Sequence, residues 1–486
     1  MSIRRNTTYN LLGSIVPVGI SLFTIPIYLG QIGEARYGVL SVAWLLLGYF
    51  GLFDLGLGRA TAQRIAALRD GTDSERAQSF WTALSLNIAL GVIGGLLIWP
   101  VAFYFFGSVF KVEDALRPEM QAAVPWLILA VPMATISGVL SGALQGRERF
   151  LELNLISVIG TVLFQVLPLM VALIWGADLR ILLPTALFIR LLTLLILFDR
   201  CRRHIFTGHP ATFVRAQVGP LLRFGGWVTV SSFVSPVMVT VDRFIIGAMA
   251  GAKEVTFYTV PFQLGERITI LPSALSSALF PRLAAADYEE QQRLAHESLR
   301  SLVVVMTPVV IAGILLMEPF IEWWITPAFA MQSARVGQII LLGFWANSFG
   351  IIPFVQLQAK GRPDLVAKCH LVEVLPYLGL LYLGLNNFGM IGAAIAFVLR
   401  VVFDFVLLAS LAGILRQSLR ILLIPILLLG GAFLTSTQTS PGQITWMALV
   451  TFNLLVAVAW AWWQAPAILL QFAFSRLDPL TKFFKK

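Results

Sequence analysis

Residues 181–204 read ILLPTALFIRLLTLLILFDRCRRH, and this stretch indicates what kind of protein the chain is. Between positions 181 and 198 the only charged side chain is Arg190, and a basic segment with Arg200, Arg202 and Arg203 follows. A helix needs about 20 mostly apolar residues to cross the hydrocarbon core of a bilayer. We therefore predict that residues 181–200 span a membrane and that the basic segment marks the cytoplasmic end.

The rest of the chain repeats this pattern. Of its 486 residues, 58% are apolar and 12% are charged, whereas a soluble protein is about a quarter charged. The mean hydropathy of +0.84 excludes a soluble enzyme and a disordered chain. We predict an all-α polytopic membrane protein with fourteen spans, near 7–29, 37–58, 78–106, 122–144, 153–175, 181–200, 222–249, 255–281, 297–317, 334–358, 368–386, 389–412, 421–436 and 444–465.

Basic residues support this map. With both termini in the cytoplasm, most of the 35 Lys and Arg fall in cytoplasmic segments, including the tail with Lys482, Lys485 and Lys486. The outer loops hold Arg36, Lys111, Arg117, Arg180, Lys253 and Arg335. This asymmetry accounts for the net charge of +10 without a nucleic-acid partner and makes membrane lipids an expected partner of the tail.

Cysteine and histidine usage predicts neither a disulfide nor a metal site. Both cysteines, Cys201 and Cys369, fall in predicted cytoplasmic segments. The histidines are scattered over three such segments at His204, His209, His296 and His370. We therefore expect no metal and no cofactor.

The two halves of the chain repeat. Phe188–Leu192 in the sixth predicted span matches Val398–Val402 in the twelfth, and two further motif pairs recur at a similar offset. A six-span repeat crosses the membrane an even number of times, so its pseudo-twofold axis runs along the membrane normal. We predict a six-helix lobe over residues 1–205, a second over 206–415 with a cleft between the lobes, and two extra helices with the basic tail over 416–486.

Charges in the predicted spans are candidate functional groups. Arg190, Arg267 and Arg400 lie near the midplane, where a charge costs roughly 2.5–3.5 kcal/mol, so they should face the protein interior or a wet cavity. Arg243 lies nearer the outer face and is expected to snorkel. The alternative is helix-locking ion pairs, which Arg400 can form with Asp404 one turn away. Arg190 has no acid one turn away on its own helix, which favours an anion-facing role.

Polar and acidic residues extend this candidate site. Of the adjacent Glu266 and Arg267, we favour Arg267 for the cleft. Polar residues recur on one face of single spans, although small polar residues also occur at helix–helix interfaces. The predicted cleft residues are Asn10, Ser14, Ser21, Arg190, Arg267, Gln356 and Arg400, and the predicted gating or coupling acids are Asp54, Asp242, Glu266 and Asp404.

Asp54 is the candidate for gating on the cytoplasmic side. It lies near the inner end of the second span, beside Gly51, Gly56 and Gly58, which permit close helix approach. The alternative is a static cap on this helix end.

Arginine binds phosphate through a planar fork of donors. Several arginines around a polar cleft therefore suit an anionic, hydroxyl-rich head group, such as one that a flippase carries across while the lipid tail stays in the bilayer.

Several motifs resemble a known family. They are Gly33–Gly38, Asp54–Ala60, Asp242–Gly247 with Glu254 and Tyr258, and Leu279–Pro281. Over about residues 1–412 the pattern resembles the polysaccharide-transporter branch of the multidrug/oligosaccharidyl-lipid/polysaccharide exporter superfamily. The resemblance implies a flippase of the bacterial inner membrane for undecaprenyl-pyrophosphate-linked oligosaccharides, including O-antigen units, in a pathway that also involves a polysaccharide polymerase.

Three alternatives remain beside this interpretation. One is a cation-coupled drug exporter of the same superfamily, although such a protein should favour carboxylates over arginines in its cleft. The second is a lipid II flippase, from whose pattern the Tyr37-Gly38 and Asp54–Leu57 elements differ. The third is a membrane enzyme, which the short outer loops, such as 107–121, argue against. We therefore expect a transporter and no catalytic residues.

Overall fold

The computed structural model describes residues 3–68 and 71–465, and every regular element in these residues is a helix. Within them, ten helical stretches are long and apolar enough to cross a membrane. Large apolar side chains such as Leu97, Ile174, Leu375 and Leu427 are exposed on these helices, as expected where lipid surrounds the protein. The predicted all-α membrane architecture is confirmed.

Helix packing divides the chain into two compact units, residues 1–256 and 257–486. The lobe boundary near residue 205 and the cleft between the lobes stay predictions. The N-terminal unit contains α1 (Ile3–Tyr49), a 3₁₀ turn (Phe50–Asp54), α2 (Leu57–Ala67), α3 (Asp73–Tyr104), a π-helical turn (Phe105–Val109), α4 (Arg117–Gly146), α5 (Phe150–Trp175), α6 (Leu179–His204), α7 (Arg215–Met249) and the start of α8 (Ala252–Glu266).

The C-terminal unit continues from α8 and contains the remaining helices. They are a 3₁₀ turn (Arg267–Thr269), α9 (Ile270–Ala285), α10 (Tyr288–Trp324), α11 (Pro327–Ala359), α12 (Pro363–Ala412), α13 (Leu415–Gln438) and α14 (Ile444–Gln464). The basic tail that was predicted to contact anionic lipid lies outside the described residues.

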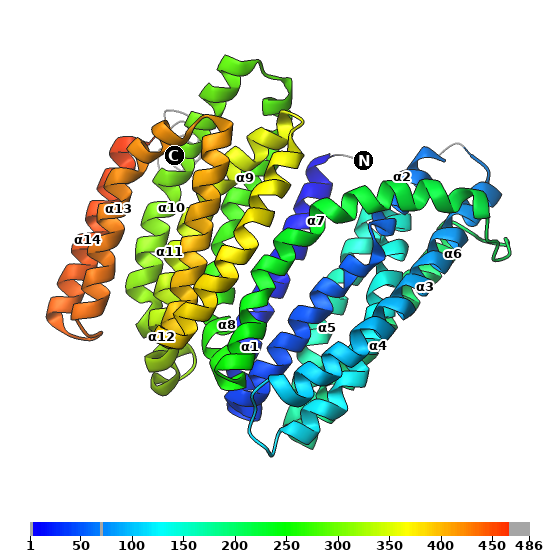
Figure 1. Cartoon of the computed structure of the whole chain (residues 1–486), viewed down its shortest axis with the longest axis horizontal. Coiled ribbons are helices and arrows are strands. Elements are labelled where there is room, and N and C mark those ends of the chain that lie inside the picture. Colours follow the sequence, from blue (N-terminus) through cyan, green and yellow to red (C-terminus); the bar gives the residue numbers. More distant parts are fainter. Residues whose placement is uncertain (1–2, 69–70, 466–486) are drawn as a thin grey trace, which may run out of the picture. The chain divides into compact units, whose positions relative to one another are not determined.

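Helix α1 is a hairpin of two helical limbs. Gly33, at φ +77° and ψ 165°, interrupts the helix with a backbone conformation that is essentially restricted to glycine. The rings of Tyr28 and Trp44 lie 5.3 Å apart, whereas a straight helix would separate these residues by about 24 Å. The first two predicted spans are therefore the two limbs of α1, as Figure 1 shows in dark blue.

Helix α12 is a second hairpin, and it turns at Gly389 (φ +57°, ψ −139°). A Cβ atom added to Gly392 would lie 1.9 Å from the carbonyl oxygen of Gly384, so the backbones of the two limbs touch beside the turn. The eleventh and twelfth predicted spans are these limbs. The eighth predicted span corresponds to α8 and α9, which the 3₁₀ turn Arg267–Thr269 separates.

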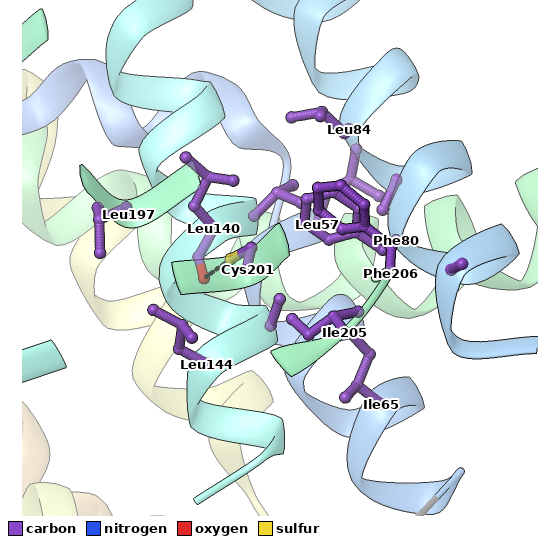
Figure 2. Packing of buried hydrophobic residues seen from close by; sticks show 14 of the residues in the cluster. Leu57, Ile65, Phe80, Leu84, Leu140, Leu144, Leu197, Cys201, Ile205 and Phe206 are labelled. Atoms are coloured by element: carbon purple, nitrogen blue, oxygen red, sulfur yellow. Dashed lines mark hydrogen bonds between the residues drawn. The ribbon is translucent and has the colours of Figure 1, made fainter. Parts of the chain in front are cut away.

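An apolar cluster fills the end of the N-terminal unit that is predicted to be cytoplasmic. Figure 2 shows Leu57 of α2 beside Phe80 of α3 and Phe206. The rings of Phe80 and Phe206 are stacked, with 5.0 Å between their centroids. The Cys201 thiol donates a hydrogen bond to the Leu140 carbonyl oxygen over 3.4 Å. This cluster attaches the short helix α2 to the ends of α3, α4 and α6.

Helix α7 begins beside α2 and α3 and continues along α1 (Figure 1). The extended segment before α7 is fixed where the Val214 N–H donates to the Thr82 hydroxyl over 3.0 Å. The start of α7 and the exposed face of α2 therefore lie together at the same end of the unit.

Candidate functional site

Arg190 is half-buried on α6, with its guanidinium carbon 5.0 Å from the ring centroid of Phe164 on α5. A cation over an aromatic face is held there by electrostatic attraction. No side chain among the described residues forms an ion pair or hydrogen bond with the guanidinium. The stacking orients Arg190 without using its hydrogen-bond donors.

An aromatic cluster adjoins Arg190 in the N-terminal unit. The rings of Tyr28, Tyr37 and Trp44 are 5.3 to 6.2 Å from one another, and Trp44 lies 6.0 Å from Phe164. The Tyr28 hydroxyl donates to the backbone oxygen of Gln165 over 2.7 Å. Trp44 Nε1 and Gln165 Oε1 are buried, and neither has a hydrogen-bond partner within the described residues. Polar atoms of this kind usually pair with a neighbour or with water.

The polar stripe of the first span is only partly described. The side chains of Asn10 and Ser14 lie outside the described residues, and Ser21 is half-buried on the first limb of α1. Sequence reasoning missed Trp44, Phe164 and Gln165, because it considered polar residues one span at a time. Recognition of the turn at Gly33 would have placed Trp44 opposite Tyr28.

Arg267 occupies the break between α8 and α9. It is half-buried and begins the 3₁₀ turn, whereas the preceding Glu266 is exposed. The Thr269 hydroxyl donates to the Glu266 carbonyl oxygen over 2.7 Å. This carbonyl group therefore keeps a hydrogen-bond donor although the α-helix is interrupted here. Broken helices inside membrane proteins occur where the backbone lines a cavity or is buried in protein.

The hairpin of α12 brings Arg400 against the opposite limb. Its guanidinium carbon lies 5.5 Å from the Tyr377 ring and 5.9 Å from the Phe397 ring. Glu373 lies close enough to interact with Arg400 electrostatically. Arg400 Nε is buried and has no hydrogen-bond partner in the described part of the chain.

The alternative for Arg400, an ion pair with Asp404 one turn away, is not formed. Asp404 Oδ1 instead lies 3.5 Å from His370 Nε2 on the other limb of α12. The spacing of four residues takes account of one helix only. The turn at Gly389 brings the other limb of α12 within reach of the Asp404 side chain. His370, Glu373, Arg400 and Asp404 together form a partly buried cluster of charged and titratable groups, and we call these four residues the α12 cluster.

Gln356 of α11 is fully buried, and neither polar atom of its side chain has a hydrogen-bond partner within residues 3–68 and 71–465. Two other polar residues of α11 are satisfied by protein groups: Gln338 donates to the Ile314 oxygen over 3.2 Å, and Trp345 Nε1 donates to the Thr307 hydroxyl over 3.1 Å. Those two residues serve the α10–α11 interface, which leaves Gln356 as the site candidate of these three.

Asp242 and Arg243 form a buried ion pair in α7, with 3.0 Å between Oδ1 and Nη1. Arg243 was expected to snorkel towards the outer face, and this expectation is wrong because its guanidinium turns back to the neighbouring carboxylate. The pair lies within the N-terminal unit, whose boundary at residue 256 places α7 there.

Asp54 caps the turn before α2. Its carboxylate accepts hydrogen bonds from the backbone N–H groups of Gly56 at 2.6 Å and Gly58 at 3.2 Å. A Cβ added to Gly138 of α4 would lie 2.6 Å from Asp54 Oδ2, so the carboxylate also contacts α4 closely. This geometry matches the static-cap alternative, and a gating role stays a prediction.

The groups described so far can bind anions and hydroxyl-rich molecules. Within residues 3–68 and 71–465, no three His, Cys, Asp or Glu side chains are arranged to hold a metal ion. The arginines can donate hydrogen bonds, and the aromatic rings can contact apolar faces of a ligand. The membrane-spanning helices also contain a cluster of titratable side chains.

Solved structures of other proteins share this fold. A lipid II flippase MurJ in an inward closed conformation aligns with a TM-score of 0.71 at 14% identity, covering 93% of this chain and 97% of that chain. An inward-facing multidrug resistance MATE family transporter of the MOP superfamily aligns with a TM-score of 0.68 at 17% identity, covering 84% of this chain and 98% of that chain. At these identities the likeness concerns the fold alone.

Sequence comparisons identify the family. A putative O-antigen transporter of Shigella flexneri is 31% identical over 411 residues, covering 84% of this chain and 97% of the relative. The lipopolysaccharide biosynthesis protein WzxC of Escherichia coli K12 is 21% identical over 417 residues, covering 82% and 79%. Residues 3–286 match the model of the family described as polysaccharide biosynthesis protein. The chain therefore belongs to this family, in the polysaccharide-transporter branch of the exporter superfamily that its sequence motifs resemble.

Proposed function

We propose that the chain is a flippase for undecaprenyl-pyrophosphate-linked oligosaccharides, which it moves from the cytoplasmic to the outer leaflet of the bacterial inner membrane by alternating access. The similarity to a putative O-antigen transporter over most of both chains supports surface-polysaccharide assembly as the pathway. Both termini are proposed to lie in the cytoplasm. The polysaccharide polymerase machinery is a proposed partner, and the chain itself transports without catalysing a reaction.

One observation carries the proposal. Arg190 and Arg400 occupy matching positions of the two sequence repeats, and each lies over an aromatic ring. Neither forms a salt bridge with another described residue. A guanidinium oriented by a ring keeps its planar fork of donors for a pyrophosphate or an acidic sugar. The aromatic residues beside it offer apolar faces to a sugar ring.

The test is a translocation assay in proteoliposomes with a fluorescent lipid-linked oligosaccharide. We expect Arg190→Gln and Arg400→Gln each to lower the initial rate at least about ten-fold, because a charge-assisted hydrogen bond contributes about 1.5–3 kcal/mol. Arg180→Gln at the exposed start of α6 and Arg416→Gln at the exposed start of α13 are the matched controls. Wild-type rates in both site variants would refute the assignment.

The same assay separates the alternative substrates. Lipid II in place of the oligosaccharide tests the lipid II flippase, and a cationic dye tests the drug exporter. Transport of either molecule at the rate of the oligosaccharide would contradict the proposed substrate class.

We further propose that the membrane potential drives transport. A pyrophosphate carries roughly two negative charges, so outward movement in an inside-negative field of 100 mV is favoured by roughly 4–5 kcal/mol. The competing mechanism uses a counter-ion that an acid such as Asp242 or Glu266 carries. A potassium–valinomycin potential without a proton or sodium gradient should drive translocation. If flipping ignores this potential and follows an ion gradient, the acids become the coupling site.

A further inference from the structure

A pocket lies between α2 and the start of α7, at the end of the N-terminal unit that the basic residues predict to be cytoplasmic. Its volume is about 370 Å³, within the range of small-molecule sites. The lining residues are Ala60, Gln63 and Arg64 of α2 and Ala216, Gln217, Pro220 and Leu221 of α7.

Two members of the apolar cluster, Ala60 and Leu221, line this pocket. Leu57, Ala60 and Ile65 form the buried face of α2, and Leu221 of α7 belongs to the same cluster. Gln63 and Arg64 follow Ala60 by three and four residues, so they lie on the same side of α2 as Ala60, and both are exposed beside α7. The pocket therefore has an apolar floor and a polar, positively charged rim.

Within the described residues the Arg64 guanidinium forms no ion pair and no side-chain hydrogen bond, although Glu75 attracts it electrostatically. Glu75, an acidic neighbour at the start of α3, is occupied by the capping box of that helix: its Oε2 accepts from the Thr72 N–H at 2.9 Å and the Thr72 hydroxyl at 3.0 Å.

The amide oxygen of Gln217 is buried and accepts no hydrogen bond from the residues that the structure describes. This oxygen can accept from a hydroxyl group of a ligand, whereas only the amide N–H groups can bind a phosphate oxygen. The amide groups of Gln63 and Gln217 can each donate to an oxygen of a bound group. One arginine fork and two amides around an apolar floor match a phosphate attached to a hydrocarbon chain.

We propose that this pocket binds the phosphate of a lipid head group at the cytoplasmic surface of the membrane. The phosphate contacts Arg64, and the first part of the lipid chain lies against the apolar floor. Two lipids present this chemistry: an isoprenoid pyrophosphate, as in the proposed substrate, and an anionic phospholipid of the bilayer. The site does not depend on which oligosaccharide the protein carries.

The test measures binding to the purified full-length protein in a maltoside detergent, which contains no phosphate. The probes are geranyl pyrophosphate and dihexanoyl phosphatidylglycerol. We expect Arg64→Gln to weaken binding of at least one probe about ten-fold or more, since a hydrogen bond to a charged group is lost. Ala216→Trp should fill the pocket and have a similar effect without a change of charge.

Arg59→Gln is the matched control, because Arg59 is exposed on α2, carries the same charge and does not line the pocket. Its affinities should stay within about two-fold of wild type. A preference for geranyl pyrophosphate assigns the pocket to the isoprenoid carrier, and a preference for phosphatidylglycerol assigns it to the bilayer. The proposal is overturned if neither probe binds, if Arg59→Gln weakens binding as much as Arg64→Gln does, or if a correctly folded Ala216→Trp protein binds as wild type does.

Discussion

Replacing Glu119 by Gln should destabilise the N-terminal unit, because this carboxylate joins three helices at one end. Its two oxygens accept bidentate hydrogen bonds from Arg36 beside the turn of α1, at 3.0 Å from Nε and 2.7 Å from Nη2. Glu119 Oε2 also accepts from the backbone N–H of Leu179, the first residue of α6, at 3.3 Å. Glutamine cannot accept both hydrogen bonds from the guanidinium, and it leaves a positive charge without its partner.

The structure sets the size of this effect. The side chain of Glu119 is 12% exposed and that of Arg36 is 32% exposed, so water screens the arginine more than the carboxylate. Hydrogen bonds to charged groups contribute about 1.5–3 kcal/mol, and partial exposure of the arginine reduces this to about 1–2 kcal/mol. For a unit of this size, that loss lowers the midpoint of thermal unfolding by roughly 2–8 °C.

Thermal unfolding in detergent, followed by tryptophan fluorescence, measures the change. Asp114→Asn is the control, because its 3.9 Å ion pair with Arg117 involves a fully exposed carboxylate, and it should leave the midpoint unchanged. The hydrogen bond to Glu119 raises the pKa of Arg36. A raised pKa on a base stabilises the fold at every pH below its unfolded value, so the difference should be constant from about pH 6 to 9. Equal midpoints for Glu119→Gln and Asp114→Asn would refute the reasoning.

Three further changes test the hairpin and the site. Gly389→Ala should lower the unfolding midpoint, because a residue with a Cβ adopts the backbone conformation of this turn at a cost of about 1–3 kcal/mol. Gly379→Ala in the same helix is the control and should not lower the midpoint. Gln356→Leu should raise the midpoint because it removes buried unpaired polar atoms, and Gln338→Leu should lower it because it breaks an existing hydrogen bond. Phe164→Leu should reduce translocation several-fold in proteoliposomes at unchanged protein yield, because the guanidinium above its ring loses its orientation.

Much of the fold could be predicted because lipid imposes a simple rule on sequence. Each spanning helix must be apolar over about 20 residues, and basic loops mark one side. The predicted spans 37–58 and 389–412 correspond to the second limbs of α1 and α12. Hydropathy does not report where two spans join without a loop, so it did not distinguish a hairpin turning at a single glycine from two separate helices.

The candidate site was less predictable because its contacts cross between helices. Arg190 was identified from its depth in one span, but Phe164, which orients it, is an ordinary apolar residue of another span. Likewise, spacing along one helix made Asp404 the alternative partner of Arg400, whereas Asp404 interacts with His370 and Glu373 on the opposite limb. The sequence shows which charges are expensive to place in a membrane, and only the packing of helices shows which groups surround them.

The two hairpins have a consequence for biosynthesis. Residues that meet across each turn, such as Tyr28 with Trp44 and Tyr377 with Arg400, are separated by short stretches of chain. Contacts this local form quickly and require no other part of the protein. Because a ribosome delivers the chain from its N-terminus, the hairpin of α1 can enter the membrane as a closed pair of helices before α3 has been made. The polar tip at Gly33 then crosses the bilayer once, with its two limbs already packed together.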